Sequence, residues 1–332
     1  MNWATIWRFA TVMFLLLATL AMVSCKSAVI SRPTDNPLAD PDADHAQQGS
    51  KPELPAAFMV MIDNHSAARP QYGLAKADIV YEFVCETGIT RFLAAFHSQD
   101  PVRVGPVRSI RYYYLHIAKA YDLPLAHVGG NMDALALRTP LNIKSVCAIT
   151  NAGSAFFSDP QRKSPHATYT TSEAVLAVAT QRGYKPLGLP EVPRGDWQTG
   201  QAVAEVEIQY SSKYKVAWVY QADEQCYSRL LSGSPHLTAE QEPITAQNII
   251  IIEAPVKTVK VPVDEIQSEI KIIGQGKALF LRDGKLVSGT WQKDKPEAHF
   301  KYLLDDCTEF TFAAGSIWIQ QVHSLSRDVV YK

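Results

Sequence analysis

Apolar positions in the first half of the folded chain change repeatedly between the spacing of strands and the spacing of helices. Residues 57–63 (AFMVMID) form a continuous apolar run, which predicts a strand buried on both faces. Residues 78–86 are apolar at every second position, and together with residues 91–98 they predict a hairpin. Apolar side chains at helical spacing predict a helix over residues 109–122, with Ser109 as its N-cap.

Two further elements complete this half of the chain. Residues 123–130 predict a strand that runs into a Gly-Gly turn, and residues 172–182 predict a helix that ends before Gly183. Strands that alternate with helices, with one pair joined in a hairpin, are typical of a sheet with mixed strand directions. The pattern therefore predicts a mixed α/β (α+β) N-terminal domain over residues 55–183.

The second half of the chain has a different pattern. Proline and glycine are frequent in residues 184–202, which we interpret as a linker. Beyond it, strand-like runs follow one another with few helical stretches, and Asp283-Gly284 is typical of a type I′ hairpin turn. We therefore expect a mostly β C-terminal domain over residues 203–332.

The N-terminus is organised like a bacterial secretion signal. The uncharged run Phe9–Met22 has 14 residues, fewer than the roughly 20 of a membrane-spanning helix. It ends in Met-Val-Ser-Cys, which resembles a lipobox, so residues 1–25 are interpreted as a lipoprotein signal peptide with Cys25 as the lipidated, palmitate-bearing residue. The alternative is an uncleaved anchor helix. Both interpretations place the folded part on the extracytoplasmic face of a membrane, and the proline-rich residues 26–54 predict a disordered tether.

Charge and composition narrow the classes of function. The chain has 332 residues, with 32 Lys and Arg against 33 Asp and Glu, and a net charge of −1. Without a basic excess, nucleic-acid binding is not expected. The four cysteines after Cys25 form no close C-x-x-C pair, and they are expected as buried free thiols or as one disulfide within either half. We expect neither a metal nor a cofactor.

The densest cluster of charged side chains is VRVGPVRSIR at residues 102–111. With a helix beginning at Ser109, Arg108 and Arg111 would share a face beside the helix N-terminus, which attracts anions. Guanidinium groups there can bind phosphate or carboxylate through paired hydrogen bonds. In the alternative interpretation both arginines connect the helix to the sheet by pairing with three carboxylates, Asp78, Glu82 and Glu86.

Two polar loops offer further candidates. The proline-broken loop at residues 158–170 contains Arg162, Lys163 and His166, and histidine suits acid–base chemistry because it titrates near neutrality. A lone loop histidine is also commonly a solvated or capping residue. The loop after the first strand contains Asp63 and Arg69, at a place where α/β sheets tend to bind ligands. Asp63 and the nearby His65 are two potential metal ligands, too few for a site, so no metal is predicted.

Taken in order, several segments resemble the YerB-like lipoproteins of bacteria, a family without an established activity. The resemblance spans residues 56–323, and it rests on VMIDNHSAARPQYGLAKADIVYE, GITRFLAAFHS, VGPVRSIRYYYL, HVGG, RKSPHATYT, YSRLLSG, GTWQK and GSIWIQQV. It implies a two-part architecture, in which an N-terminal domain carries the arginine-rich motifs and a smaller C-terminal domain is rich in strands. It also implies a lipoprotein.

Three functions remain open. In the first, the protein is a lipid-anchored extracytoplasmic binder of an anionic envelope component, such as a wall polymer or a lipid-linked precursor. Its cleft would be lined by Arg69, Arg91, Arg108, Ser109, Arg111, Arg162 and Lys163.

In the second, the protein is a transferase or hydrolase acting on the same material. The acid–base group would then be Asp63, Glu82 or His166. In the third, the β-rich domain is a docking module for protein partners of the envelope machinery, with exposed tryptophans as its signature. The candidates for that role are Trp197, Trp218 and Trp291.

Overall fold

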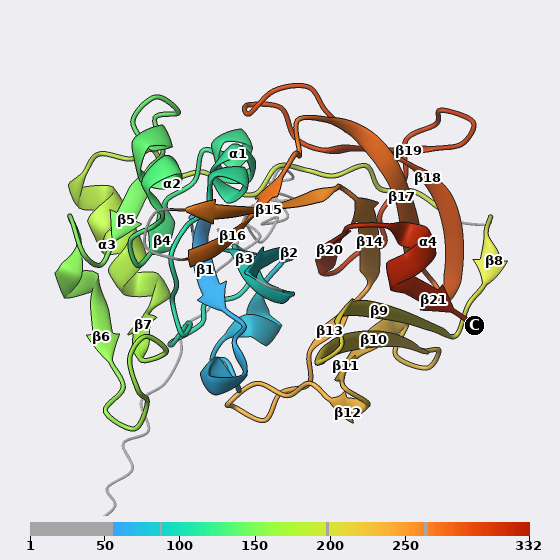
Figure 1. The fold of residues 1–332 in the computed structure, drawn as a ribbon, viewed down its shortest axis with the longest axis horizontal. Coiled ribbons are helices and arrows are strands. Elements are labelled where there is room, and N and C mark those ends of the chain that lie inside the picture. Colours follow the sequence, from blue (N-terminus) through green and yellow to red (C-terminus); the bar gives the residue numbers. More distant parts are fainter. Residues whose placement is uncertain (1–55, 87, 197–198, 262–264) are drawn as a thin grey trace, which may run out of the picture. The chain divides into compact units, whose positions relative to one another are not determined.

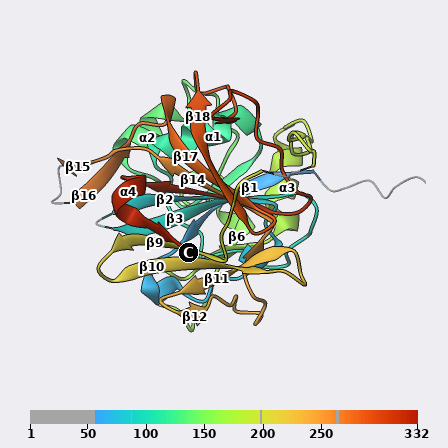
Figure 2. The ribbon, with the colours of Figure 1, turned by 90° about the vertical axis from the view of Figure 1, so that its right-hand side faces the viewer.

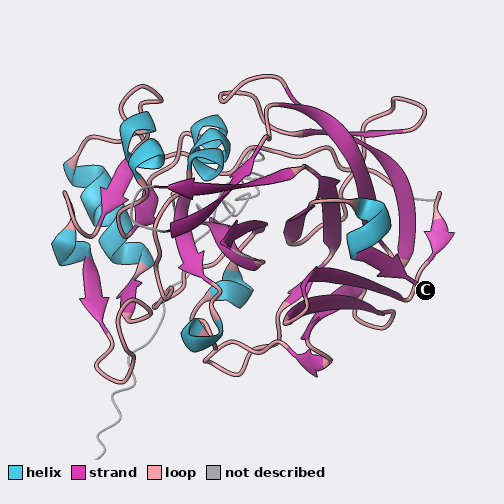
Figure 3. Cartoon of the chain, viewed as in Figure 1, coloured by secondary structure: helices cyan, strands magenta, loops and turns pink. Residues whose placement is uncertain are grey.

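The computed structural model describes residues 56–332, except residues 87, 197–198 and 262–264. The predicted signal peptide, Cys25 and the tether at residues 26–54 lie outside the described residues. All described residues belong to one compact unit. Strands predominate in it, and Figure 3 shows the few helices gathered mainly around the N-terminal half.

A mixed sheet of eleven strands runs through the whole unit (Figure 1). Its main path, in spatial order, is β19-β18-β17-β14-β20-β2-β3-β1-β4-β5, and the short β8 pairs with β18. The strands are β1 Phe58–Asp63, β2 Ile79–Glu86, β3 Ile89–Phe96, β4 Leu125–His127, β5 Ser145–Cys147, β8 Gln201–Ala202, β14 Asn248–Glu253, β17 Gly274–Arg282, β18 Lys285–Lys293, β19 Lys301–Leu304 and β20 Ile317–Val322.

The sheet is continuous across the two halves of the chain. Strand β20, near the C-terminus, lies between β14 and β2 and pairs parallel with both. The segment before β8 also packs on the unit, because Ala57 donates a backbone hydrogen bond to Leu187 and Arg194 forms a bridge with Phe312. The limits of the two domains and of the linker at residues 184–202 stay a prediction. The halves share one sheet and the two cores on its faces.

A second sheet of six strands packs against one face of the first. In it, β12-β11-β10-β9-β21 are neighbours and β13 pairs with β11, and Figure 2 shows β9 to β12 below the large sheet. These strands are β9 Glu205–Ser211, β10 Tyr214–Gln221, β11 Cys226–Leu231, β12 Ser234–Pro235, β13 Thr245–Ala246 and β21 Val329–Tyr331. Two hairpins stand apart, β6 Phe156–Ser158 with β7 Thr168–Thr170 and β15 Val256–Val261 with β16 Glu265–Ile270.

The large sheet buries apolar side chains on both faces. In β1, Met59 and Met61 face a core shared with α1 (Tyr112–Tyr121) and α2 (Met132–Leu137). Val60 and Ile62 face the opposite core, which α3 (Ser172–Gln181) and the second sheet complete. The short α4 (Leu325–Asp328) precedes β21. The continuous apolar run in β1 therefore arises because both faces of this central strand are covered.

The structure confirms the predicted fold class and most predicted elements. The hairpin of β2 and β3 forms, β4 ends before Gly129-Gly130, and α3 begins after the N-cap Thr171. Asp283 and Gly284 both have positive φ and connect β17 to β18, as the type I′ turn requires. Within the described part of the chain, no helix is long and apolar enough to span a membrane.

The predicted start of helix α1 is wrong by three residues. The helix begins at Tyr112, and the N-cap is Arg111 in extended backbone, where Ser109 was expected. The backbone before it is already used by the sheet, since Arg108 donates its N–H to Met61 and Ile110 donates its N–H to Gly129. These strand-like bonds outweigh the N-cap preference of Ser109, so Arg108 and Arg111 do not share a helix face.

Candidate functional site

The candidate site lies at the carboxyl ends of parallel strands. Strands β1, β4 and β5 run parallel, and their last residues are Asp63, His127 and Cys147. Ligands of α/β sheets commonly bind at this edge. His127 is enclosed there, with Nδ1 2.8 Å from the Gly129 carbonyl oxygen and Nε2 2.7 Å from Ser145 Oγ. Both ring nitrogens are therefore engaged, and the polar groups that remain available lie around Asp63.

Asp63 joins two side chains that lie far from it in the sequence. Its Oδ2 atom is 2.7 Å from Nδ1 of His166 and 3.2 Å from Nε of Arg108, and its Oδ1 atom accepts the backbone N–H of His65 at 2.9 Å. Arg108 is held in place by the bridge between Ile62 and Val107. The two loops singled out in the sequence thus meet the arginine motif at one carboxylate.

Two imidazole rings stack at this point. The rings of His65 and His166 are nearly parallel, with centroids 4.8 Å apart. His65 Nδ1 accepts the backbone N–H of Ala67 at 3.1 Å, so the ring proton is on Nε2. This N–H group can donate a hydrogen bond to an anion. The carboxylate of Asp63 holds the proton of His166 on Nδ1, which leaves the Nε2 lone pair of the neutral ring free to accept one.

The arginines beside Asp63 form a second group around Glu86. Arg91 pairs opposite Asp63 across β1 and β3, and its side chain contacts Glu86 Oε1 at 3.2 Å and the Ser109 carbonyl oxygen at 2.7 Å. Arg111 also pairs with Glu86. Burial acts to raise the pKa of Glu86, but the charges of Arg91, Arg111 and Arg108 outweigh it, and the pKa lies below its usual value. The ion pair between Arg111 and Glu86 therefore connects the start of α1 to β2.

The balance of charge around Asp63 and Glu86 is positive. Three arginines, Arg91, Arg108 and Arg111, interact with two carboxylates, which leaves one positive charge in excess. Burial acts to raise the pKa of Asp63, but the His65 N–H, the charge of Arg91 and the contacts with His166 and Arg108 together lower it. Asp63 therefore stays ionised at neutral pH.

The remaining predicted ligand-binding residues have different surroundings. Arg162 donates to the backbone carbonyl oxygens of Ala67, Arg69 and Pro70, so it holds the first loop in shape. Arg69 donates to the Asn64 side chain and carbonyl oxygen and lies over the Tyr214 ring. Lys163 is exposed, and Ser109 contributes its backbone carbonyl to Arg91.

Glu82 lies in a different, fully buried network. Its Oε2 atom is 2.8 Å from Nη2 of Arg229, and its Oε1 atom accepts the hydroxyls of Tyr214 at 2.6 Å and Thr90 at 2.8 Å. Both side chains of the ion pair have 0% exposure. Gln320 donates to the same carboxylate, so the network joins the two halves of the chain. Arg229 lies within the YSRLLSG motif, but sequence reasoning gave it no role, because nothing in the motif points to a partner 147 residues away.

The other carboxylate of the alternative interpretation also lies elsewhere. Asp78 Oδ2 accepts the backbone N–H groups of His97 and Ser98 at 2.7 and 3.0 Å. Neither Asp78 nor Glu82 pairs with Arg108 or Arg111. The prediction that these two carboxylates connect the arginines to the sheet is therefore wrong, and Glu86 alone of the three has that role.

The tryptophans predicted as a docking signature do not form an exposed surface. Trp218 and Trp291 are buried, with exposures of 0% and 2%. Trp218 donates its ring N–H to Gln320, and Trp291 donates to the Glu253 carbonyl oxygen. Trp197 lies outside the described residues. Packing at strand spacing explains the positions of Trp218 and Trp291.

The four described cysteines form no disulfide. Cys85, Cys147 and Cys226 are buried free thiols, and Cys307 is free and exposed. No group of three or more His, Cys, Asp or Glu in the described ranges has the arrangement of a metal site.

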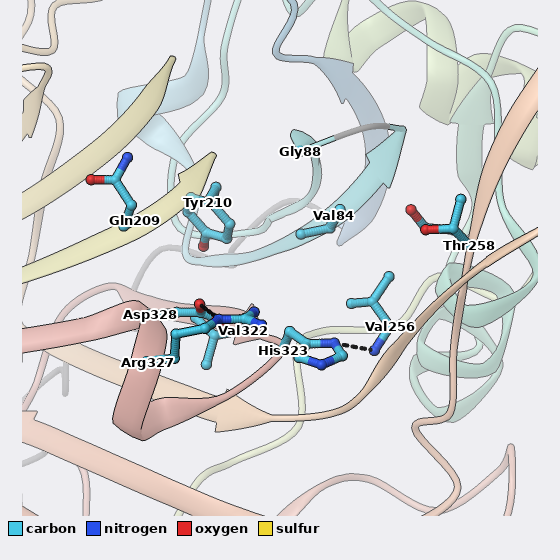
Figure 4. Close-up of a pocket in the computed structure, with 11 residues that line it drawn as sticks. Val84, Gly88, Gln209, Tyr210, Val256, Thr258, Val322, His323, Arg327 and Asp328 are labelled. Atoms are coloured by element: carbon cyan, nitrogen blue, oxygen red, sulfur yellow. Dashed lines mark hydrogen bonds and ion pairs between the residues drawn. The ribbon is translucent and has the colours of Figure 1, made fainter. Parts of the chain in front are cut away.

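A polar cavity of about 280 Å³ lies where the two halves of the chain meet (Figure 4). Val84 and Tyr210 lie opposite His323 and Arg327 in this view. His323 Nδ1 accepts the Val256 N–H at 3.1 Å, and Arg327 Nε is paired with Asp328 at 2.6 Å. None of the residues predicted from the sequence as site residues lines this cavity. Its arginine is already neutralised.

Comparisons with known proteins agree with this architecture. The family model for the N-terminal domain of "Protein of unknown function (DUF3048)" matches residues 45–185, and that for its C-terminal domain matches residues 206–319. "Putative lipoprotein YerB" of Bacillus subtilis (strain 168) is 29% identical over 355 aligned positions, which cover 100% of this chain and 98% of the relative. The crystal structure of the YerB protein from Bacillus subtilis matches with a TM-score of 0.75 and 28% identity, over 84% of this chain and 94% of that one.

The two domain matches, in this order, have the arrangement expected from the sequence motifs. Together with the relative and the solved structure they cover both halves of the folded unit. The chain therefore belongs to the YerB-like family, and it has both an N-terminal and a C-terminal DUF3048 domain.

Proposed function

We propose that the protein is a lipid-anchored extracytoplasmic protein that binds the phosphate or carboxylate group of an envelope component. The ligand would be a wall polymer or a lipid-linked precursor, bound by Arg108 together with the Nε2–H group of His65. The observation that carries the proposal is the state of Arg108. In the described part of the chain its one ion pair is with Asp63, 3.2 Å from Nε, and neither Nε nor the terminal nitrogens donate a hydrogen bond to the protein.

The surroundings of Arg108 favour an anion. The excess positive charge of the three arginines lies beside the Nε2–H group of His65, which supplies a second donor. A planar guanidinium can bind two oxygens of one phosphate or carboxylate at once. Arg108 is only partly buried, with 23% of its side chain exposed, so an anion can reach it from solvent. Arg91 and Arg111, in contrast, are buried and act by their charge.

The proposed location rests on the sequence and on the relative. The N-terminal run that ends at Cys25 resembles a lipoprotein signal, and the relative that matches the whole chain carries the name of a lipoprotein. A diacylated cysteine supplies two acyl chains, which is enough for stable anchoring. The anchor would keep the Arg108 site near lipid-linked or wall-bound ligands.

Calorimetric titration with pyrophosphate tests the binding site. Arg108→Gln should weaken binding by at least about tenfold, because a hydrogen bond to a charged group contributes roughly 1.5–3 kcal/mol. Lys277→Gln is the matched control, since it also removes one positive charge and Lys277 is exposed on β17. Equal affinity of the wild type and Arg108→Gln would refute the site. Equal losses of affinity in Arg108→Gln and Lys277→Gln would show that pyrophosphate responds only to the net charge of the protein.

The contact between Asp63 and His166 favours an enzyme as the second candidate. A carboxylate 2.7 Å from Nδ1 orients the ring and leaves Nε2 as a general base, which is the arrangement found in hydrolases and transferases. Arg108 would then stabilise charge in the transition state. Turnover of a labelled wall precursor that disappears in His166→Gln would support this function, whereas binding without turnover favours the first.

A further inference from the structure

An apolar cavity of about 350 Å³ lies on the opposite side of β2 from the Glu82 network. It is enclosed by β2, the end of α1, strand β20, residues 190–193 and residues 298–312. This volume is in the range of small-molecule sites in proteins. It is independent of Arg108 and of the anion site proposed above.

The walls of the cavity are mainly aromatic. Tyr81, Phe300 and Tyr302 follow one another with ring centroids 6.0 Å apart, and Tyr302 continues to Phe312 at 6.0 Å. On the other side Tyr81 packs edge-on against Tyr121 at 6.3 Å. The faces of aromatic rings carry partial negative charge and attract cations.

One hydroxyl in this wall keeps a free acceptor position. Tyr302 is 7% exposed, and its buried oxygen atom interacts with the hydroxyl of Tyr81 without ideal hydrogen-bond geometry. The Tyr81 hydroxyl also bonds to that of Tyr121 at 2.9 Å. A hydroxyl oxygen has two lone pairs, so Tyr302 can still accept a hydrogen bond from a ligand.

The charged groups of the wall favour a positive ligand. Glu191 and Glu309 line the cavity, are exposed and form no ion pair in the described part of the chain. Lys301 is the one cation among the lining residues, which leaves the lining itself a net charge of −1, and the Lys293 ammonium outside it lies over the Phe300 ring at 5.6 Å. His299 completes the set; its burial and the charge of Lys293 lower its pKa, so it is neutral at pH 7.

We propose that this cavity binds an organic ammonium ion that carries an apolar group. The apolar group fills the space among Tyr81, Phe300 and Phe312, and the ammonium group lies against the rings, where Tyr302 Oη accepts one N–H. Glu191 and Glu309 compensate the charge. Neither an anion nor a purely apolar molecule uses all three features.

Three probes of similar size and different charge test the proposal on the full chain in mild detergent. They are phenethylammonium, neutral 2-phenylethanol and anionic phenylacetate, titrated by calorimetry. Trp291 gives a second readout, because its ring packs against Phe300 at 5.7 Å and its fluorescence should change on binding. The ammonium ion is expected to bind roughly two- to thirtyfold more tightly than the alcohol, and the anion most weakly.

Two kinds of variant connect the binding to the cavity. Ala298→Phe fills the space and should abolish binding, with Ala222→Phe in an exposed turn as the size-matched control. Tyr302→Phe keeps the ring and removes only the hydroxyl, so it should lower the affinity for the ammonium ion several-fold without unfolding the chain. Glu191→Gln with Glu309→Gln should remove most of the preference for the ammonium ion over the alcohol.

Several results would overturn the proposal. These are no binding of phenethylammonium to the wild type, equal or tighter binding of the alcohol or the anion, and unchanged binding in Ala298→Phe. Binding that Tyr302→Phe and the double glutamine variant both leave unchanged would also overturn it, because the ammonium group would then lie elsewhere.

Discussion

Nδ1 of His166 lies 2.7 Å from Oδ2 of Asp63, although 103 residues separate them in the chain. The contact fixes which ring nitrogen of His166 is free, and it places that nitrogen beside Arg108, the second partner of the same carboxylate oxygen. Asp63 therefore connects His166 of the second polar loop to Arg108 of the arginine-rich motif. Whether the site binds or reacts depends on what this carboxylate does.

Asp63→Asn separates these two functions. It removes one carboxylate from a group with one excess positive charge, so a site that only binds anions should retain or increase its affinity for pyrophosphate. The measurement is calorimetric titration beside Arg108→Gln. A loss as large as that of Arg108→Gln would contradict binding by charge, and it would show that Asp63 is needed to hold Arg108 in place.

Glu82→Gln should destabilise the fold strongly and leave anion binding unchanged. The change removes the charge that compensates Arg229, which is fully buried, and such losses typically cost about 3–5 kcal/mol. Urea unfolding measures the change in free energy. The control is Glu207→Gln, whose surface pair with Lys215 should contribute no more than about 1 kcal/mol. Similar losses in both variants would contradict the structural importance of the buried pair.

Stability should fall as the pH drops below about 6.5, in part because of His236. Burial, with the charges of Arg229 and Arg69, lowers the pKa of His236 well below its usual 6.5. The unfolded chain therefore binds a proton that the folded chain excludes. This contribution is complete above pH 6.5 and is lost as the pH falls toward the folded pKa.

His236→Gln isolates that contribution. Urea unfolding at several pH values should show a slope reduced by at most about 1.4 kcal/mol per pH unit relative to the wild type. The pKa values of His116 and His299 are also lowered by burial. The stability of the variant should therefore still depend on pH in part. An unchanged slope in the variant would show that folding does not lower the pKa of His236.

Cys25→Ala should release the protein from the membrane fraction and abolish incorporation of labelled palmitate. The substitution removes the only thiol of the lipobox-like segment. Ser24→Ala is the matched control, because a small residue before the cysteine is kept. Retention of the Cys25→Ala variant in membranes would favour the alternative of an uncleaved anchor helix.

The elements that the sequence predicted well are those with a strong local pattern. Strand β1 is apolar throughout because both its faces are covered, and α3 has both its periodicity and its N-cap Thr171 within a few residues. The start of α1 was misplaced because long-range bonds decide it. The N–H groups of Arg108 and Ile110 pair with segments that precede and follow them in the chain, and local propensity carries no sign of those partners.

The individual residues of the candidate site could be predicted from the sequence, but their arrangement in space could not. Asp63, Arg108 and His166 each stood out in a motif, and the fold brings them together at the edge of the sheet. Glu82 also stood out, but its role follows from Arg229, which lies in the other half of the chain and was given no role by its motif. Burial and pairing of that kind arise from tertiary packing and leave no local pattern.

Histidine NMR tests the anion site most directly. The chain has nine histidines, and ring-labelled protein gives one signal for each, assigned with His65→Gln and His166→Gln. Added pyrophosphate should move the signals of His65 and His166, leave that of His323 in place, and have no such effect in Arg108→Gln. Shifts confined to other histidines, or the same shifts in Arg108→Gln, would contradict an anion site at Arg108.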